Sequence, residues 1–171
     1  NLKFMYAQLM TAVNCDSKGY TIDDTSCRVC NYFSEYENLR HLLLDCKAPQ
    51  IVDARRKVIL DVCNAVKQYG STFSATRFQR MLVLDNLSIC FHSTNNAPPD
   101  EDYERTFLFL TGRWDDELIQ FMISLVKDEH VAILFRSIGF SLRLYWRSVW
   151  KIWRMAALPY GSFDPLNVHS P

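Results

Sequence analysis

Glycine is scarce in this chain, and the sequence signatures of catalysis and of membrane insertion are missing. Only 5 of the 171 residues are glycine, and no glycine-rich phosphate loop, G-x-S-x-G nucleophile elbow or H-E-x-x-H zinc-protease motif occurs. No uninterrupted apolar stretch of about 18 or more residues is present, so we expect no membrane span. No residues remain on which a catalytic site could be based, and we expect a protein that is not an enzyme.

Net charge is also absent, because 19 basic residues balance 19 acidic residues. The overall composition therefore gives no support for a nucleic-acid-binding protein. The distribution is uneven, however. Asp85 to Glu117 holds eight acidic and two basic residues, whereas Val131 to Phe163 holds five basic residues and no acidic one. The neutral total conceals an acidic segment and a basic one.

Apolar residues make up 49% of the chain, which is enough for a buried core. Their helical spacing predicts a mostly α fold, a helical bundle with a small zinc knuckle near the N-terminus. The expected segments are an N-terminal helix and linker at 1–20, a CCHC zinc knuckle at 21–49, a helical segment at 50–93, a loop at 94–102, C-terminal helices at 103–158 and a tail at 159–171. Because the chain begins at Asn1 and not at Met, we expect a piece of a longer polypeptide, although cleavage or tag removal would give the same start.

Proline, glycine and serine positions predict the helix boundaries. Pro49 can begin a helix but cannot continue one, and Gly70 is typical of the position just after a helix ends. Ser74 is the expected N-cap of the next helix. The pattern from Glu129 to Ala157 predicts one long helix, or two helices joined near Gly139.

The most informative feature is a C-x2-C-x10-H-x4-C array formed by Cys27, Cys30, His41 and Cys46. Three thiolates and one imidazole suit a tetrahedral Zn²⁺ ion. Four protein ligands leave no open position for a catalytic water. The array therefore predicts a closed, structural zinc site.

Redox-active or disulfide-bonded cysteines are the alternative. A thioredoxin-like C-x-x-C needs alternating strands and helices, and the helical pattern shows no such alternation. The other three cysteines, Cys15, Cys63 and Cys90, are singly placed, and no signal peptide precedes the array. Both observations favour a reducing compartment. We therefore expect an intracellular protein, nuclear or cytoplasmic, with Zn²⁺ as its cofactor.

The array and the leucines within it resemble the zinc-binding region downstream of the reverse transcriptase domain in non-LTR retrotransposons. The matching residues are Cys27, Cys30, Glu37, Leu39, His41, Leu42, Leu43, Leu44 and Cys46. Weaker similarity extends over the arginine-bearing helix after the array and over the aromatic, basic helix near the C-terminus. Arg40 and Lys47 stand where the family often has glutamate and proline. Asn31 replaces a common glycine, and asparagine tolerates the left-handed backbone that glycine adopts there.

The resemblance implies a non-catalytic accessory domain that positions RNA or target DNA while a separate polymerase domain copies it. The chain has no paired-aspartate polymerase motif of its own. RNA or DNA is the partner that this implies, together with a polymerase domain or another protein. A hypothesis of a different class is a zinc-stabilised protein–protein interaction module that does not bind nucleic acid.

Basic residues near the predicted ligands are candidate nucleic-acid contacts. Arg28, Arg40 and Lys47 can offset the net negative charge of three thiolates around Zn²⁺, or they can meet phosphate. The resemblance adds Arg55 and Arg56 of the helix that follows the array. Either function for these cations is consistent with the sequence.

A second group of candidates lies on the C-terminal helix, at spacings of four, four and three residues that place them on one helical face. This cationic stripe consists of Arg143, Arg147, Lys151 and Arg154. It is bordered by Tyr145, Trp146, Trp150 and Trp153. The rings can form the core, they can stack on bases of a single strand, or the helix can bind a membrane surface or a partner helix.

Overall fold

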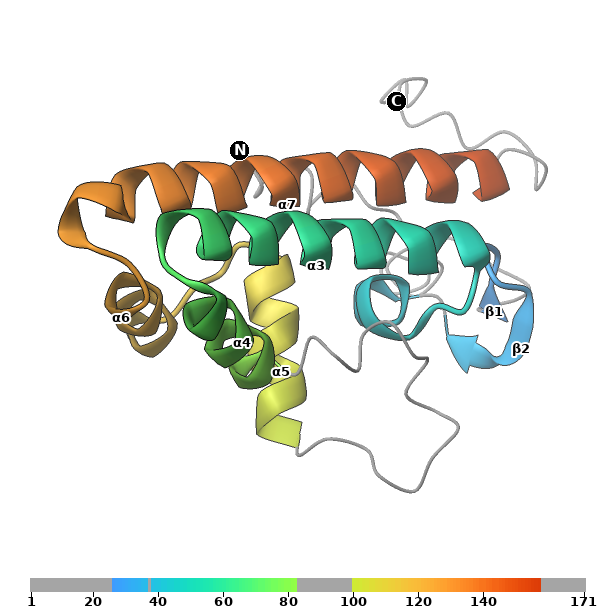
Figure 1. Ribbon diagram of the computed structural model, residues 1–171. Helices are drawn as coiled ribbons and strands as arrows, with labels where there is room; N and C mark the ends of the chain where they lie inside the picture. The colour runs from blue at the N-terminus through green and yellow to red at the C-terminus, as the bar shows by residue number, and fades with distance from the viewer. Residues whose placement is uncertain (1–25, 37, 83–99, 158–171) are drawn as a thin grey trace, which may run out of the picture.

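Two long helices lie side by side and antiparallel along the length of the molecule (Figure 1). They are α3 (Pro49–Tyr69) and α7 (Asp128–Ala157). This computed structural model describes residues 26–36, 38–82 and 100–157. The predicted N-terminal helix, the last part (83–93) of the predicted helical segment, the loop up to residue 99 and the tail at 159–171 lie outside the described residues. Three shorter helices pack on one side of the pair, and the cysteine-rich segment lies at the end where α3 begins and α7 finishes. The predicted mostly α fold is confirmed.

Helix α3 begins and ends where the sequence predicts. Pro49 occupies its first turn, and Gly70 is its C-cap, with the Gly70 amide donating to the Val66 carbonyl. The core-facing side of α3 carries residues spaced three and four apart, as an amphipathic helix requires. The buried residues of α3 are Ile51, Arg55, Val58, Val62, Cys63, Ala65 and Val66. Arg55 is the exception among these otherwise apolar side chains.

Helix α4 (Thr72–Met81) follows after a tight connection, and its N-cap is not the predicted one. Ser71 caps the helix, since its side-chain oxygen accepts from the Ser74 amide at 3.0 Å. Ser74 lies inside the first turn instead, and its hydroxyl donates to the Leu125 carbonyl at 2.9 Å. Two serines lie three residues apart at the start of this helix. Ser71 is the N-cap because its backbone is extended, as the N-cap position requires.

Helix α5 (Asp100–Leu110) begins earlier than expected, so residues 100–102 are helical and not part of the predicted loop. Its end is a Schellman motif. The Gly112 amide donates to the Phe109 carbonyl, and the Arg113 amide donates to the Leu108 carbonyl. Gly112 has a φ of 71°, the left-handed conformation that this motif requires and that glycine adopts without strain.

Helix α6 (Asp116–Ser124) starts at an Asp115 cap, whose carboxylate accepts from the Leu118 amide at 2.7 Å. After it, α7 runs as one continuous helix through Gly139, which decides between the two predicted alternatives. No helix in the described part of the chain is both long and apolar enough to cross a membrane.

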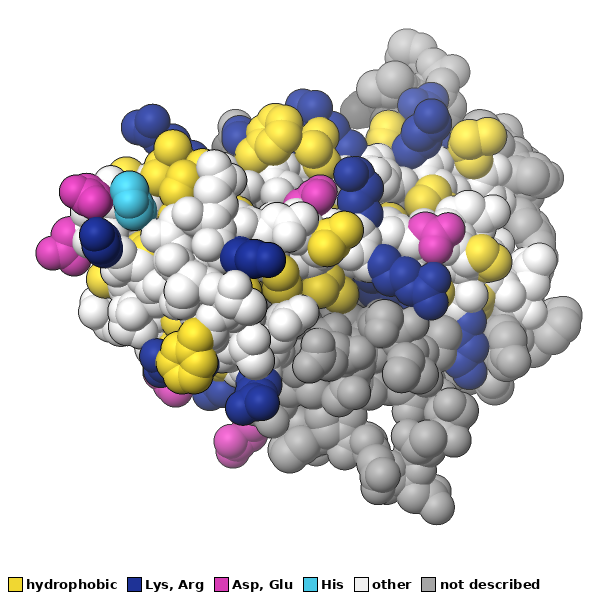
Figure 2. Space-filling view, in the orientation of Figure 1, with side chains coloured by type: hydrophobic (Ala, Val, Ile, Leu, Met, Phe, Trp, Pro, Cys, Tyr) yellow, Lys and Arg dark blue, Asp and Glu magenta, His cyan; other side chains and the backbone are white. Residues whose placement is uncertain are grey.

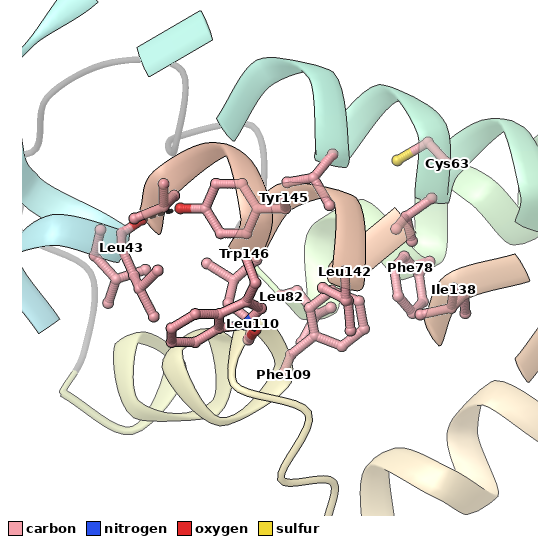
Figure 3. Close-up of a cluster of buried hydrophobic side chains, with 14 of the residues drawn as sticks. Leu43, Cys63, Phe78, Leu82, Phe109, Leu110, Ile138, Leu142, Tyr145 and Trp146 are labelled. Atoms are coloured by element: carbon pink, nitrogen blue, oxygen red, sulfur yellow. Dashed lines mark hydrogen bonds between the residues drawn. The ribbon is translucent and has the colours of Figure 1, made fainter. Parts of the chain in front are cut away.

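The core lies between the α3–α7 pair and the shorter helices, and Figure 3 shows its centre. Trp146 is buried there, and its indole N–H donates to the Leu110 carbonyl at 2.8 Å. Phe78 of α4 and Phe109 of α5 meet edge to face with ring centroids 5.5 Å apart. Tyr145 is also buried, so two of the four rings that border the cationic stripe belong to the core and cannot stack on bases.

Two glycine substitutions test this packing in opposite directions. A Cβ at Gly70 would lie 2.5 Å from the Leu125 carbonyl oxygen and 2.9 Å from that of Val66, both backbone atoms that cannot turn aside. Gly70→Ala should therefore destabilise the protein by about 2 kcal/mol in chemical denaturation. A Cβ at Gly139 would have no other heavy atom within 4 Å, so Gly139→Ala should stabilise α7 by about 0.5–1 kcal/mol. A stabilised Gly70→Ala protein would contradict the α3–α6 contact.

Candidate metal centre

The first half of the site is a tight β-hairpin made by β1 (Ser26–Cys27) and β2 (Tyr32–Tyr36). The turn between them carries Cys30. Its last residue, Asn31, has a φ of 54°, and the Asn31 amide donates to the Cys27 carbonyl at 2.8 Å. The expected left-handed asparagine is thus confirmed, and it turns the chain so that Cys27 and Cys30 face the same point.

The second half is a single wide turn, the π-helical segment η1 (His41–Asp45). The Asn38 side-chain oxygen accepts from the His41 amide at 2.8 Å, which fixes the start of the turn. The Cys46 amide donates to the His41 carbonyl at 2.6 Å, which closes it. Leucines 42–44 are buried in the core, so apolar packing holds His41 and Cys46 in place.

The structure brings all four predicted ligands together. Their ligand atoms, three Sγ and one imidazole nitrogen, lie within 4.8 Å of one another. The Cys30 Sγ lies 3.4 Å from the His41 Nε2. Tetrahedral zinc with ordinary Zn–S and Zn–N bonds would separate sulfur from nitrogen by about 3.6 Å and sulfur from sulfur by about 3.8 Å. The four residues therefore fit a single tetrahedral ion.

Burial and thiol pairing make this cluster suitable for a structural metal. Cys27, His41 and Cys46 are buried, and Cys30 is half-buried. The hydrogen bond from Cys46, with a smaller contribution from His41, lowers the pKa of Cys27 to about 4 despite its burial. The same pairing, together with burial, raises the pKa of Cys46. A cation that binds both sulfurs needs both as thiolates, so metal binding would release a proton here.

A buried arginine holds the ligand-bearing turn against α3. The guanidinium of Arg55 donates from its two terminal nitrogens to the carbonyls of Leu44 and Cys46. Only 1% of Arg55 is exposed, so water cannot satisfy these groups in its place. Arg55 is therefore not available to phosphate, and its sequence-based assignment to nucleic acid is wrong. Its positive charge lies beside the cluster that three thiolates make negative.

Helix α7 contacts the same region at two points. The Tyr145 hydroxyl donates to the Leu43 carbonyl at 3.0 Å, and burial raises the pKa of Tyr145, which keeps the hydroxyl a donor (Figure 3). The Arg28 guanidinium, in the hairpin turn, lies 5.5 Å from the ring of Trp153. Both halves of the cluster are thus attached to α7.

Helix α5 packs on the cluster through a third set of contacts. Arg40 lies over the ring of Tyr103 at 4.6 Å and pairs with Glu104 at 3.1 Å. Burial raises the pKa of the Tyr103 hydroxyl, and its hydrogen bond to Asp45 raises it further. Arg40 therefore has protein partners where the sequence suggested phosphate.

The remaining predicted nucleic-acid residues lie in two environments. Lys47 is half-buried beside the cluster, and Arg56 is exposed on α3, where it pairs with Asp53 at 3.6 Å. The other four candidates are all exposed on the outer face of α7: Arg143, Arg147, Lys151 and Arg154. The structure thus separates a group of cations packed around the cluster from a solvent-facing group on α7.

The fold and the site define a mostly helical protein with a buried Cys3His cluster able to hold a metal ion. No protein-family model, curated protein or solved structure matches the chain.

Loss of one ligand should remove the metal. Cys46→Ser should purify with far less than one zinc ion per chain by elemental analysis and should unfold at a lower temperature, because metal-binding energy is folding energy here. Cys63, buried in α3 outside the cluster, supplies the matched control: Cys63→Ser should keep about one ion per chain. Equal zinc content in the two variants would contradict the site.

Replacing the buried Arg55 should lower the free energy of unfolding, whereas replacing its exposed neighbour Arg56 should not. Arg55→Met leaves the Leu44 and Cys46 carbonyls without their donors and should lower the free energy of unfolding by about 2–4 kcal/mol. Arg56→Met removes only an exposed ion pair and should change it by less than about 0.5 kcal/mol. Denaturant titrations of the two variants measure the difference, and equal stability would refute the role given to Arg55.

Proposed function

We propose that this chain is a zinc-stabilised, non-catalytic nucleic-acid-binding domain, an accessory element of the kind that its resemblance to retrotransposon reverse transcriptases implies. Zinc is the metal that best suits three thiolates and one imidazole in tetrahedral arrangement. Its role is to fix the hairpin and η1 against the helical core. Nucleic acid binds elsewhere, on the outer face of α7.

One observation carries the nucleic-acid proposal: the outward face of α7 is cationic and free of acidic residues from 131 to 157. Arg136 extends the predicted cationic stripe by two turns toward the start of the helix and is exposed like its other members. From Arg136 to Arg154 the stripe is about 27 Å long, at 1.5 Å per helical residue. Figure 2 shows Lys and Arg side chains alternating with hydrophobic ones along the edge that α7 forms.

Aromatic rings next to these cations suit a nucleic-acid partner. The Arg143 guanidinium lies 6.0 Å from the ring of Phe140, and the Arg154 guanidinium lies 5.4 Å from that of Trp150. Phe140 is 56% exposed, and Trp150 is half-buried. Positive charge attracts the phosphate backbone, and exposed rings offer surfaces on which bases stack.

A protein-interaction module is the second candidate, and exposed apolar side chains favour it. Leu60 of α3 and Met155 of α7 are 60% and 64% exposed. Large exposed apolar residues are common at protein interfaces. Binding driven by such residues would depend weakly on salt, whereas phosphate contacts make affinity fall steeply as salt rises.

A charge-removal variant separates the two functions. The variant changes Arg143, Arg147 and Lys151 to Gln, and the control, with the same change in net charge, changes Lys67, Arg80 and Lys127 to Gln. Titration of single-stranded RNA and DNA over a range of salt concentrations should show tight, salt-sensitive binding by the unmodified protein. The affinity of the α7 variant should fall about tenfold or more, and the slope of log affinity against log salt concentration (the salt slope) should become shallower by about 2. The affinity of the control should stay within about twofold of that of the unmodified protein. Equal losses in the two variants would contradict the α7 site.

A further inference from the structure

A groove lies along the seam between α3 and α7 and is lined by side chains of both helices. Its volume is about 540 Å³, within the range of small-molecule sites. Helix α3 contributes the amide side chains of Asn64 and Gln68, and α7 contributes Phe140 between Arg136 and Arg143. Amides both donate and accept hydrogen bonds, as the edges of bases do, and guanidinium groups pair with phosphate.

Phe140 is the aromatic side chain that lines this groove. It is a large aromatic residue left 56% exposed, and it lies on α7 between the cationic stripe and the seam. The guanidinium carbon of Arg143 lies 6.0 Å from the centre of the ring. A base held between two planar groups needs about 7 Å, twice a contact distance of about 3.5 Å. A shift of about 1 Å in the flexible Arg143 side chain would therefore let a base enter between ring and guanidinium.

One carboxylate borders the groove, and it is compatible with a nucleotide. Asp61 lies on α3 with its carboxylate 3.7 Å from the Lys57 ammonium, which offsets its charge. Two guanidinium groups on the opposite wall leave the groove with positive charge in excess. A carboxylate in this position can accept from the amino group of a base.

We infer that this groove binds a base of single-stranded nucleic acid while the phosphates of the strand follow the cationic stripe. The inference rests on the proposed function and names the form of nucleic acid that the site takes. In a duplex the bases are paired and stacked inside, so none can reach Phe140 without unpairing. The groove therefore selects single strands, whereas the stripe alone would attract any polyanion.

Substitution of the stacking ring tests the groove without changing charge. Phe140→Leu should reduce the affinity for oligothymidine and oligouridine by about tenfold and leave the salt slope unchanged, because stacking is lost and phosphate contacts are not. The control is Phe73→Leu on α4, where a ring that is even more exposed, at 72%, has the Arg77 guanidinium at the same 6.0 Å. Phe73→Leu should bind like the unmodified protein. Affinity for a DNA duplex should be the same in all three proteins.

If Phe140→Leu keeps full single-strand affinity while the α7 charge variant loses it, the groove is refuted and the nucleic-acid function stands. If the unmodified protein binds neither single strands nor duplex at low salt, both fail. Thermal unfolding of both variants within a few degrees of the unmodified protein establishes that lost affinity is not lost folding.

Discussion

The carbonyl groups of the ligand-bearing turn are the constraint on which the rest of the structure depends. A turn this short and this buried cannot pair all of its own carbonyls, and an unpaired buried carbonyl costs about 1–3 kcal/mol. Arg55 of α3 donates to those of Leu44 and Cys46, and Tyr145 of α7 donates to that of Leu43. Both long helices therefore supply hydrogen-bond donors to the ligand-bearing turn, which ties the metal cluster to the helical core.

Local signals predicted the elements and the ligands well. Pro49 and Gly70 mark the ends of α3 because proline and glycine act through their own backbone, and the spacing of the cysteines and the histidine specifies a tetrahedral site by itself. The predicted N-cap of α4 was wrong because two serines, Ser71 and Ser74, lie close enough to the start of the helix to cap it. Arg55 was misassigned because its partners lie nine and eleven residues away, although its place on the apolar stripe of α3 was a sign that it is buried.

The aromatic helix shows how one element serves both core and surface. Trp146 is buried and bonded to the end of α5, whereas Phe140 and the arginines beside it face outward. Helical spacing predicted a cationic face and an apolar one, but not which rings belong to each, because that depends on where α5 and η1 pack. The metal cluster and the proposed nucleic-acid surface use different side chains, and they are linked through α7.

Because Arg55 and Tyr145 tie the ligand-bearing turn to α3 and α7, we expect the metal cluster and the helical core to unfold as one cooperative unit. This cooperativity is tested most directly with the protein loaded with Co²⁺ in place of zinc, because the thiolate–cobalt absorption reports the cluster while tryptophan fluorescence, to which the buried Trp146 contributes, follows the core. Coincident denaturant transitions of the two signals are the predicted result. Loss of the cobalt signal at low denaturant, with the fluorescence still native, would show that the cluster is an independent appendage and would contradict the account.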